Sequence, residues 1–313
     1  MSEPIPWWPG EFCEIGDRRI FVRADGTGPA SRGPRRRTVY VHGLGGASIN
    51  WTDLMGELSP DVAGEALDLP GFGHSPPPPD LDYSVDAHAA AVAGLIRSGE
   101  HPVHLVGNSL GAAVAVRTAA DFPELVHSLS LISPALPDLR PRLVPYQMTG
   151  ALVPVIGPAV YTRIQNQPPE ARVRRTLDAT YHDPSAVPAH RIMEATEAER
   201  ERDRCDYAHT AVLESLRGLV AEYLRRGPRS LWRQAAGLRC PSLLIYAGAD
   251  KFVNPRTARR AARTFPRNRL VLLPETGHVP MMERPERVAR EVRRFLHEAE
   301  AAGRRTPGIE AEL

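Results

Sequence analysis

A serine between two glycines is the first candidate for chemistry in this chain. The pentapeptide Gly107-Asn-Ser109-Leu-Gly111 separates an apolar run from an alanine-rich run, which is the context of a tight strand-to-helix turn that exposes a serine hydroxyl. Side chains at the two glycine positions would collide with neighbouring backbone in such a turn. Because the helix would begin at the serine, its N-terminal N–H groups would face negative charge on a substrate. The motif predicts Ser109 as a nucleophile, and a tight turn with an incidental serine is the structural alternative.

Two further side chains could activate this serine. A serine hydroxyl needs a general base, and the base needs an acidic partner that holds its tautomer. Asp250 follows the apolar run that ends at Tyr246, and His278 follows the run that ends at Leu273. Parallel sheets place their sites at the carboxyl ends of the strands, so both side chains would reach the edge that carries Ser109. Serine, aspartate, histidine is also the chain order that accompanies this type of turn.

The elements that must hold these residues follow from the hydrophobic pattern. Short β-branched runs alternate with longer helical patterns, which is typical of a parallel sheet with helices on its faces. The predicted fold class is therefore α/β, with a mostly parallel central sheet flanked by helices. Strands are expected at 12–15, 19–22, 38–41, 62–67, 103–106, 128–132, 242–246 and 270–273. Helices are expected at 84–96, 110–120 and 285–299 and after Pro255.

The pattern changes between Ser133 and about Trp232. Strands stop there, and helical segments such as Glu170–Thr180 and Ala208–Arg226 are punctuated by prolines. We interpret this block as a helical insert in the α/β core. The expected division is core at 1–133, helical cap at 134–232, core at 233–302 and a flexible tail at 303–313.

These segments resemble the α/β-hydrolase superfamily, in the subgroup with a helical cap between two parts of the core. The resemblance covers nearly the whole chain and adds two motifs to the loops of Ser109, Asp250 and His278. The added motifs are His42-Gly-Leu-Gly-Gly46 and Asp68-Leu-Pro-Gly-Phe-Gly-His-Ser75. In such enzymes the residue after the His-Gly pair offers its backbone N–H to the oxyanion. The resemblance therefore implies Leu44 and Leu110 as the oxyanion-hole donors, each lowering the barrier by roughly 3 kcal/mol.

The acid of the triad has two possible positions in this superfamily. In some relatives it follows the strand just after the nucleophile's helix, and here that place offers Asp138. We favour Asp250, because it follows its strand closely and Gly248 can make the turn. Asp138 lies beyond two prolines, where the chain is already leaving for the cap.

The predicted function is a serine hydrolase that cleaves a carboxylic ester, or a related acyl bond, of a small hydrophobic substrate. Ser109 would attack the carbonyl, His278 would move the proton and Asp250 would orient the imidazolium, before water cleaves the acyl-enzyme. The cap would shape the acyl pocket. Its candidate lining residues are Tyr146, Met148, Tyr161 and Met193.

Other functions of the same fold remain open. The resemblance extends to carbon–carbon bond hydrolases and cofactor-free perhydrolases, in which an asparagine precedes the nucleophile as Asn108 does here. It also extends to ligand receptors whose slow hydrolysis is incidental. The natural substrate, the acyl length and the oligomeric state do not follow from the sequence.

Composition disfavours several other partners and locations. The 313 residues include 39 basic and 37 acidic side chains, a formal charge of +2, which offers little attraction to nucleic acid. The longest apolar stretch, Leu143–Val160, is interrupted by prolines and is marginal for the ~20 residues of a spanning helix. We expect neither a nucleic-acid partner nor stable membrane insertion. The first residues lack the pattern of a signal peptide, so a cytoplasmic location is expected.

No cofactor or metal is expected. The eleven histidines form no HExxH pattern, and no glycine cluster spells G-x-G-x-x-G. The single lysine, Lys251, lies in no phosphate-binding loop. The cysteines show no CxxC spacing, which favours buried small side chains over a metal site or disulfides. These cysteines are Cys13, Cys205 and Cys240.

Overall fold

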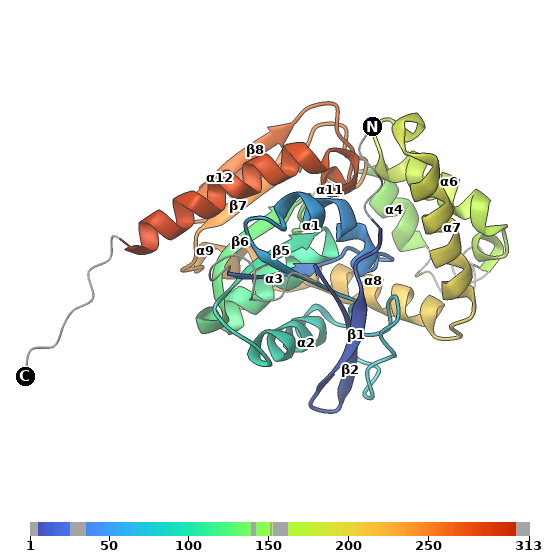
Figure 1. Cartoon of the computed structure of the whole chain (residues 1–313), viewed down its shortest axis with the longest axis horizontal. Coiled ribbons are helices and arrows are strands. Elements are labelled where there is room, and N and C mark those ends of the chain that lie inside the picture. Colours follow the sequence, from blue (N-terminus) through green and yellow to red (C-terminus); the bar gives the residue numbers. More distant parts are fainter. Residues whose placement is uncertain (1–5, 26–35, 139–141, 151, 153–161, 305–313) are drawn as a thin grey trace, which may run out of the picture.

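One sheet runs through the described part of the molecule (Figure 1). The computed structural model describes residues 6–25, 36–138, 142–150, 152 and 162–304. Within them the strand order is β1-β2-β4-β3-β5-β6-β7-β8, and only the β1–β2 and β2–β4 pairs are antiparallel. The strands are β1 (Gly10–Ile15), β2 (Arg18–Ala24), β3 (Arg37–Val41), β4 (Ala63–Leu67), β5 (Val103–Asn108), β6 (Val126–Ile132), β7 (Ser242–Ala247) and β8 (Asn268–Leu273).

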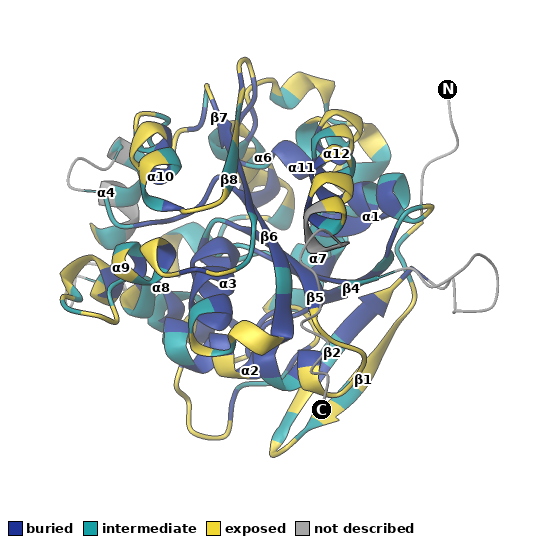
Figure 2. Cartoon of the chain, turned by 90° about the vertical axis from the view of Figure 1, so that its left-hand side faces the viewer, coloured by how far each residue is buried: buried dark blue, intermediate teal, exposed yellow. Residues whose placement is uncertain are grey.

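Helices cover both faces of this sheet, as Figures 1 and 2 show. One hydrophobic cluster joins the strands to α2 (Val85–Arg97), α3 (Leu110–Asp121), α9 (Leu231–Ala236) and α10 (Thr257–Thr264). A second cluster on the other face joins them to α1 (Thr52–Leu58), α11 (Pro280–Glu283) and α12 (Pro285–Arg304). The sheet is therefore the middle layer of three, and its strands are buried from both sides.

The register of the central strands brings their ends to one level. Val41 at the end of β3 lies opposite Gly107 of β5, and Asn108 lies opposite Ile132 at the end of β6. On the far side, the last residues of β7 and β8 also face each other. Because these strands are parallel, the loops that follow them meet at the same edge of the sheet.

The expected α/β fold class and its mostly parallel sheet are confirmed, and each predicted strand overlaps an observed one. The helix α1, together with the short 3-10 turn Ser48–Trp51 before it, was not expected. Its seven residues bury Leu54, Met55 and Leu58 against α12. Such a short segment gives too few repeats of the helical period to be distinguished from a loop.

Between β6 and β7 the described secondary-structure elements are all helices. This segment contains α4 (Leu143–Gly150), α6 (Pro169–Thr180), α7 (Ala189–Asp203) and α8 (Ala208–Leu224), followed by α9. We propose the division into core, cap and tail as the working description of the chain. The proposed cap end at 232 falls inside α9, which packs against α3 of the core.

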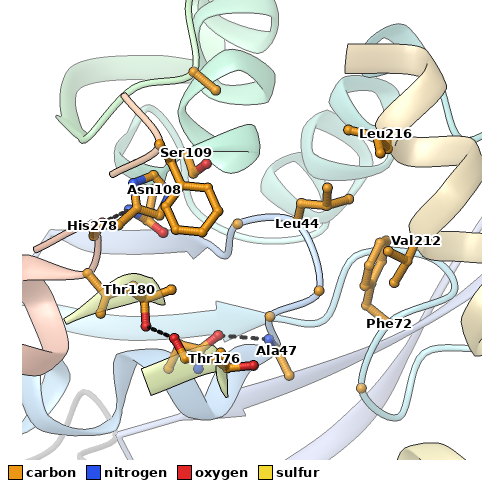
Figure 3. Close-up of a pocket in the computed structure, with 18 of the residues that line it drawn as sticks. Leu44, Ala47, Phe72, Asn108, Ser109, Thr176, Thr180, Val212, Leu216 and His278 are labelled. Carbon is orange, nitrogen blue, oxygen red and sulfur yellow. Dashed lines mark hydrogen bonds between the residues drawn. The ribbon is translucent and has the colours of Figure 1, made fainter. Parts of the chain in front are cut away.

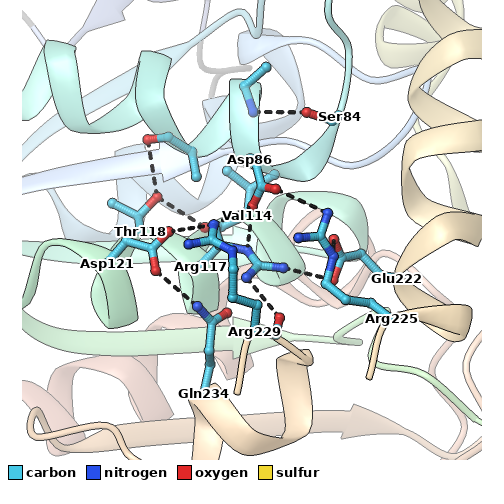
Figure 4. A network of polar contacts seen from close by, with 12 residues as sticks. Ser84, Asp86, Val114, Arg117, Thr118, Asp121, Glu222, Arg225, Arg229 and Gln234 are labelled. Atoms are coloured by element: carbon cyan, nitrogen blue, oxygen red, sulfur yellow. Dashed lines mark hydrogen bonds and ion pairs between the residues drawn. The ribbon is translucent and has the colours of Figure 1, made fainter. Parts of the chain in front are cut away.

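Helix α8 is anchored to the core by buried polar contacts, shown in Figure 4. Glu222 of α8 pairs with Arg117 of α3 at 2.7 Å, and both side chains are almost fully buried. Arg117 also pairs with Asp86 of α2 at 3.0 Å, and Asp86 in turn pairs with Arg225. Burial raises the pKa of Glu222 and lowers that of Arg117. The two charges can share this site because each neutralises the other.

No helix in the described part of the chain combines the length and the apolar character that crossing a bilayer requires.

Candidate active site

Ser109 occupies a strained turn between β5 and α3. Its backbone has φ +54° and ψ −114°, in a region that residues other than glycine rarely adopt. A side chain at Gly107 would collide with the backbone of Gly111, and one at Gly111 with the backbone of Val41. The N–H of Ser109 donates to the carbonyl of Ile132 at 3.1 Å. The two glycines and the strand ends around them therefore hold the serine in this conformation.

His278 and Asp250 form a buried pair on the loops after β8 and β7. The imidazole Nδ1 lies 3.0 and 2.9 Å from the two carboxylate oxygens of Asp250. Oδ1 of Asp250 also accepts from the N–H groups of Phe252 (2.7 Å) and Val253 (2.9 Å). With Nδ1 donating to the carboxylate, Nε2 is the nitrogen that can accept a proton.

The environment of Asp250 favours its ionised form. The side chain is buried, and burial alone would raise its pKa. The charge and hydrogen bond of His278, together with the N–H groups of Val253 and Phe252, more than offset this and hold the pKa of Asp250 below its ordinary value. Asp250 can thus stay negative beside an imidazolium.

Ser109 and His278 line the same cavity, as Figure 3 shows. The ring of His278 is hydrogen-bonded to Asp250, and the structure records no hydrogen bond from it to Ser109. Catalytic hydrogen bonds often tighten only when a substrate is bound. Proton transfer between the two residues therefore requires closer approach in the occupied site.

The glycine-rich loop after β3 lines this cavity and carries Leu44, the first of the two expected oxyanion donors. His42 is buried and accepts at Nε2 from the N–H of Leu69 (3.0 Å), so its Nδ1 donates to the carbonyl of Gly43 (2.8 Å). That carbonyl also accepts from the N–H of Gly46 (3.0 Å). The carbonyl and the N–H of a trans peptide point in opposite directions. These two bonds therefore fix the direction of the N–H of Leu44.

The burial of His42 fits this arrangement, because burial lowers its pKa and keeps the ring neutral. The loop also lies against the serine turn: a Cβ on Gly43 would be 3.0 Å from Oδ1 of Asn108 and 3.2 Å from Cβ of Ser109. Leu110 is the first residue of α3, so its N–H has no acceptor within the helix. The two expected oxyanion donors thus belong to backbone segments that approach Ser109 from two sides.

Asn108 joins the serine turn to the loop that carries His278. Its Nδ2 donates to the carbonyl of Ile132 at 3.1 Å and to the carbonyl of His278 at 3.2 Å. The side chain is almost fully buried. From the sequence we considered Asn108 only as a feature of rival chemistries, and no local pattern indicates that it would bind a residue so distant along the chain.

The cavity has a volume of about 450 Å³ and lies between the sheet edge and the cap helices. Figure 3 shows Leu44, Phe72, Val212 and Leu216 on one side of it. Thr176 and Thr180 of α6 lie on another side, near Ala47. Ser109 and His278 therefore open into a mainly apolar space with polar groups along one wall.

Of the four expected cap residues, the described structure tests Met193 alone. Met193 is 66% exposed, so its assignment to the pocket is wrong. The face of α7 that lines the cavity includes Ala195, Ala198 and Arg202, and a residue two positions before Ala195 points about 200° away from it. Tyr161 and the side chains of Tyr146 and Met148 lie outside the described residues. The aromatic lining comes instead from Trp7, Phe72, Tyr181, Tyr207, Tyr223 and Phe252.

The alternative acid, Asp138, also lines the cavity, but the hydrogen bonds of the His278 ring are to Asp250. Burial, with Asp138 as a second cause, raises the pKa of Tyr223 to about 12. Asp138 and Tyr223 of α8 line the same cavity. The geometry thus favours Asp250 as the partner of His278.

The cysteines and histidines form no other reactive cluster in the described chain. The three cysteines are free and half-buried, not buried as expected. Cys13 lies on the edge strand β1 and Cys205 on the cavity wall, so neither is enclosed by the core. Among the described residues, no three His, Cys, Asp or Glu side chains are grouped so that they could hold a metal ion.

The strand order and the strained serine between β5 and α3 define an α/β-hydrolase fold. The chain belongs to the alpha/beta hydrolase family, whose model matches residues 38–291.

Individual relatives span different activities. The chain is 25% identical over 290 residues to Lipase 3 of Moraxella sp. (strain TA144), covering 90% of this chain and 81% of that protein. It is 28% identical over 301 residues to 2-hydroxymuconate semialdehyde hydrolase of Pseudomonas sp. (strain CF600), covering 94% and 98%. The crystal structure of a putative lipase from Acinetobacter baumannii AYE superposes with a TM-score of 0.78 at 20% identity, covering 94% and 92%. That last likeness concerns the fold alone.

Proposed function

We propose that this protein hydrolyses carboxylic esters through an acyl-enzyme formed at Ser109. The observation that carries the proposal is the meeting of the strained serine and the buried His278–Asp250 pair at one apolar cavity. The similarity to a protein named as a lipase supports ester bonds as the target.

In the proposed mechanism, Oγ of Ser109 attacks the ester carbonyl and its proton passes to Nε2 of His278. The imidazolium is stabilised by the Asp250 carboxylate, which is hydrogen-bonded to Nδ1. The charged oxygen of the tetrahedral intermediate accepts hydrogen bonds from the N–H groups of Leu44 and Leu110, and each bond lowers the activation barrier by roughly 3 kcal/mol. His278 then protonates the leaving alcohol. Water then attacks the acyl-enzyme. His278 takes a proton from the water and returns it to Oγ of Ser109, and the carboxylic acid leaves.

The charges around the cavity favour an uncharged substrate. Among its described lining residues, four carboxylates against two guanidinium groups leave a formal charge of −2. Both guanidinium groups are engaged: Arg202 donates to the carbonyl of Gly45 and is ion-paired with Glu199, and Arg23 donates to the carbonyl of Trp8. The acidic residues are Asp68, Asp138, Glu199 and Glu201. A carboxylate on the substrate would be repelled here, so we propose neutral esters with an apolar acyl group.

Carbon–carbon bond hydrolysis is the second candidate, supported by the 28% identity to 2-hydroxymuconate semialdehyde hydrolase over nearly both chains. The acidic excess in the cavity argues against a muconate-like substrate, which carries a carboxylate. No cofactor is required in either reaction as proposed. The cytoplasmic location stays a prediction.

The test compares p-nitrophenyl esters of increasing acyl length with a carboxylate-bearing dienoate, in wild type and in Ser109→Ala. We expect repeated turnover of the neutral esters and reaction of a fluorophosphonate probe at Ser109, with both lost in Ser109→Ala. Preferred cleavage of the dienoate would instead establish the second candidate. A single slow acylation per chain would identify a receptor and contradict the proposed function.

A further inference from the structure

The cap helices α6 and α7, with the turn between them, form a hairpin (residues 169–203) that touches three of the loops on which the proposed catalytic residues lie. These are the oxyanion loop (residues 42–46), the acid loop (residues 248–253) and the histidine loop (residues 276–279). The proposed mechanism assigns this hairpin no role beyond lining the pocket. Its contacts with the loops are made by specific side chains and carbonyls.

The first contact is on the oxyanion loop. Nη1 of Arg202, near the end of α7, donates to the carbonyl of Gly45 at 3.0 Å. Gly45 has φ +71°, a left-handed conformation, and its neighbour Leu44 carries the proposed donor. Arg202 is also ion-paired with Glu199, one turn earlier on the same helix. The guanidinium is thereby held in place over the loop.

The second contact is on the acid loop. Lys251, the residue after Asp250, donates from Nζ to the carbonyl of Asp178 in the last turn of α6. Carbonyls in the last turn of a helix lack N–H donors within the helix and lie at the negative end of its dipole, so a cation is favoured there. Lys251 is the single lysine of the chain.

The third contact is on the histidine loop. The N–H of His278 donates to the carbonyl of Thr180, the last residue of α6, at 2.5 Å. Beside it, Oε2 of Glu283 accepts from the N–H of Gly277 at 2.6 Å, while Oε1 accepts from the N–H groups of His182 (3.2 Å) and Asp183 (3.4 Å). One carboxylate thus bridges the histidine loop and the chain that leaves α6.

The hairpin and the histidine loop are closely packed against each other here. A Cβ on Gly277 would collide with the carbonyl of Thr180. A shift of the hairpin would therefore move the loop that carries His278. The same shift would break the Arg202 contact on the opposite side of the cavity.

We propose that the α6–α7 hairpin is a positioning element for catalysis, and that Arg202, Lys251 and Glu283 are the positioning residues through which it holds the oxyanion, acid and histidine loops. This inference rests on the proposed function, because it assumes that those loops carry the reaction. Displacing reacting groups by about 1 Å can cost up to about a hundredfold in rate. The hairpin would thus contribute to kcat even though none of these three side chains takes part in a bond-making step.

The test uses Arg202→Gln, Lys251→Met and Glu283→Gln in the full chain. Two matched controls are Arg200→Gln, whose side chain pairs with Glu170 and Glu197 within the hairpin, and Glu286→Gln in the first turn of α12. Three quantities are measured: kcat and KM for p-nitrophenyl butyrate and for ethyl butyrate, the rate of labelling by a fluorophosphonate, and the melting temperature.

For Arg202→Gln we expect kcat for both esters and the labelling rate to fall by about tenfold, with KM within about twofold of wild type. Glu283→Gln should slow ethyl butyrate more than p-nitrophenyl butyrate, because ethoxide needs a proton from His278 to leave and p-nitrophenoxide does not. Lys251→Met should show a smaller loss, of about threefold, since its contact is exposed. The controls should match wild type.

The inference is overturned if the three variants keep wild-type kcat and labelling rates. It is also overturned for Glu283 if both esters slow equally while the melting temperature falls, because that pattern indicates a purely structural role. Failure of the proposed function has a different signature: wild type itself would not turn over any ester. The labelling rates would still report on the hairpin in that case, because labelling does not require turnover.

Discussion

The loops beneath the cavity and the helices above it are held by different kinds of contact. Beneath, Ser109, His278 and the oxyanion loop are positioned by backbone contacts and glycines at the ends of buried strands. Above, α8 is held by a buried ion network and the α6–α7 hairpin by half-exposed side chains. Substitutions in the loops should therefore change the chemistry and leave the fold intact. Substitutions in the anchors of α8 should lower the stability of the fold and leave the chemistry unchanged.

The largest effect is expected at the acid. Asp250→Asn keeps the size of the side chain but favours the wrong tautomer of His278, and in a serine protease such a change costs about ten-thousandfold in kcat. We expect a loss of at least about a hundredfold in kcat here, with little change in the melting temperature. Asp138→Asn, in the same cavity, is the matched control and should lose little. The opposite result in esterase assays would make Asp138 the acid.

The second-largest effect is expected in the oxyanion loop. Gly43→Val places a Cβ about 3 Å from Asn108 and Ser109, and its methyl groups would displace the loop. We expect kcat to fall by about a hundredfold, as for the loss of one oxyanion donor, with an unchanged circular dichroism spectrum. Wild-type turnover in this variant would remove the loop from the mechanism.

The anchor of α8 should show the reverse pattern. Glu222→Gln leaves Arg117 buried with only the more exposed Asp86 as a charged partner, and we expect the free energy of unfolding to fall by about 2 kcal/mol. Below the melting transition, kcat should stay within about twofold of wild type. Glu214→Gln, on the exposed side of α8, is the control. A large loss of kcat at full stability would contradict the separation of the two regions.

A graded effect on stability should appear on acidification. Burial lowers the pKa of His88 and of His104 to about 3, against about 6.5 in the unfolded chain. Below pH 6.5 the unfolded state therefore binds more protons, and stability should fall by about 1.4 kcal/mol per pH unit for each of them. Urea unfolding at pH 7, 6 and 5 measures this slope.

Because His88 is hydrogen-bonded to Ser215 of α8, His88→Gln should remove about half of the slope attributed to the two histidines. This variant would extend the comparison to the contact between α8 and the core. A stability that does not change between pH 7 and 5 would contradict the neutral, buried state of both residues.

The sequence predicted the loops better than the helices above them, and the reason is physical. The serine turn requires glycines at two positions and a strand before it, so Gly107 and Gly111 can be recognised from the local sequence. The wall of the cavity has no such requirement. Its residues are set by which face of each cap helix turns inward and by the path of the loops, and both depend on packing between distant segments. Met193 was misassigned for this reason.

The contacts between loops could not be predicted from the sequence either. Asn108 and Glu283 act through bonds to backbone groups that any residue could supply. No residue type or spacing marks such a partner. Only the register of the strands and the path of the cap bring them together.

The left-handed backbone of Ser109 has an evolutionary consequence. A glycine at this position would adopt φ +54° without the steric cost that a side chain imposes. The residue proposed to carry the reaction is therefore not the one that conformational stability alone would select. Drift toward a more stable chain would tend to erase the nucleophile, so persistence of a serine at this turn would itself be a sign of continuing selection for chemistry.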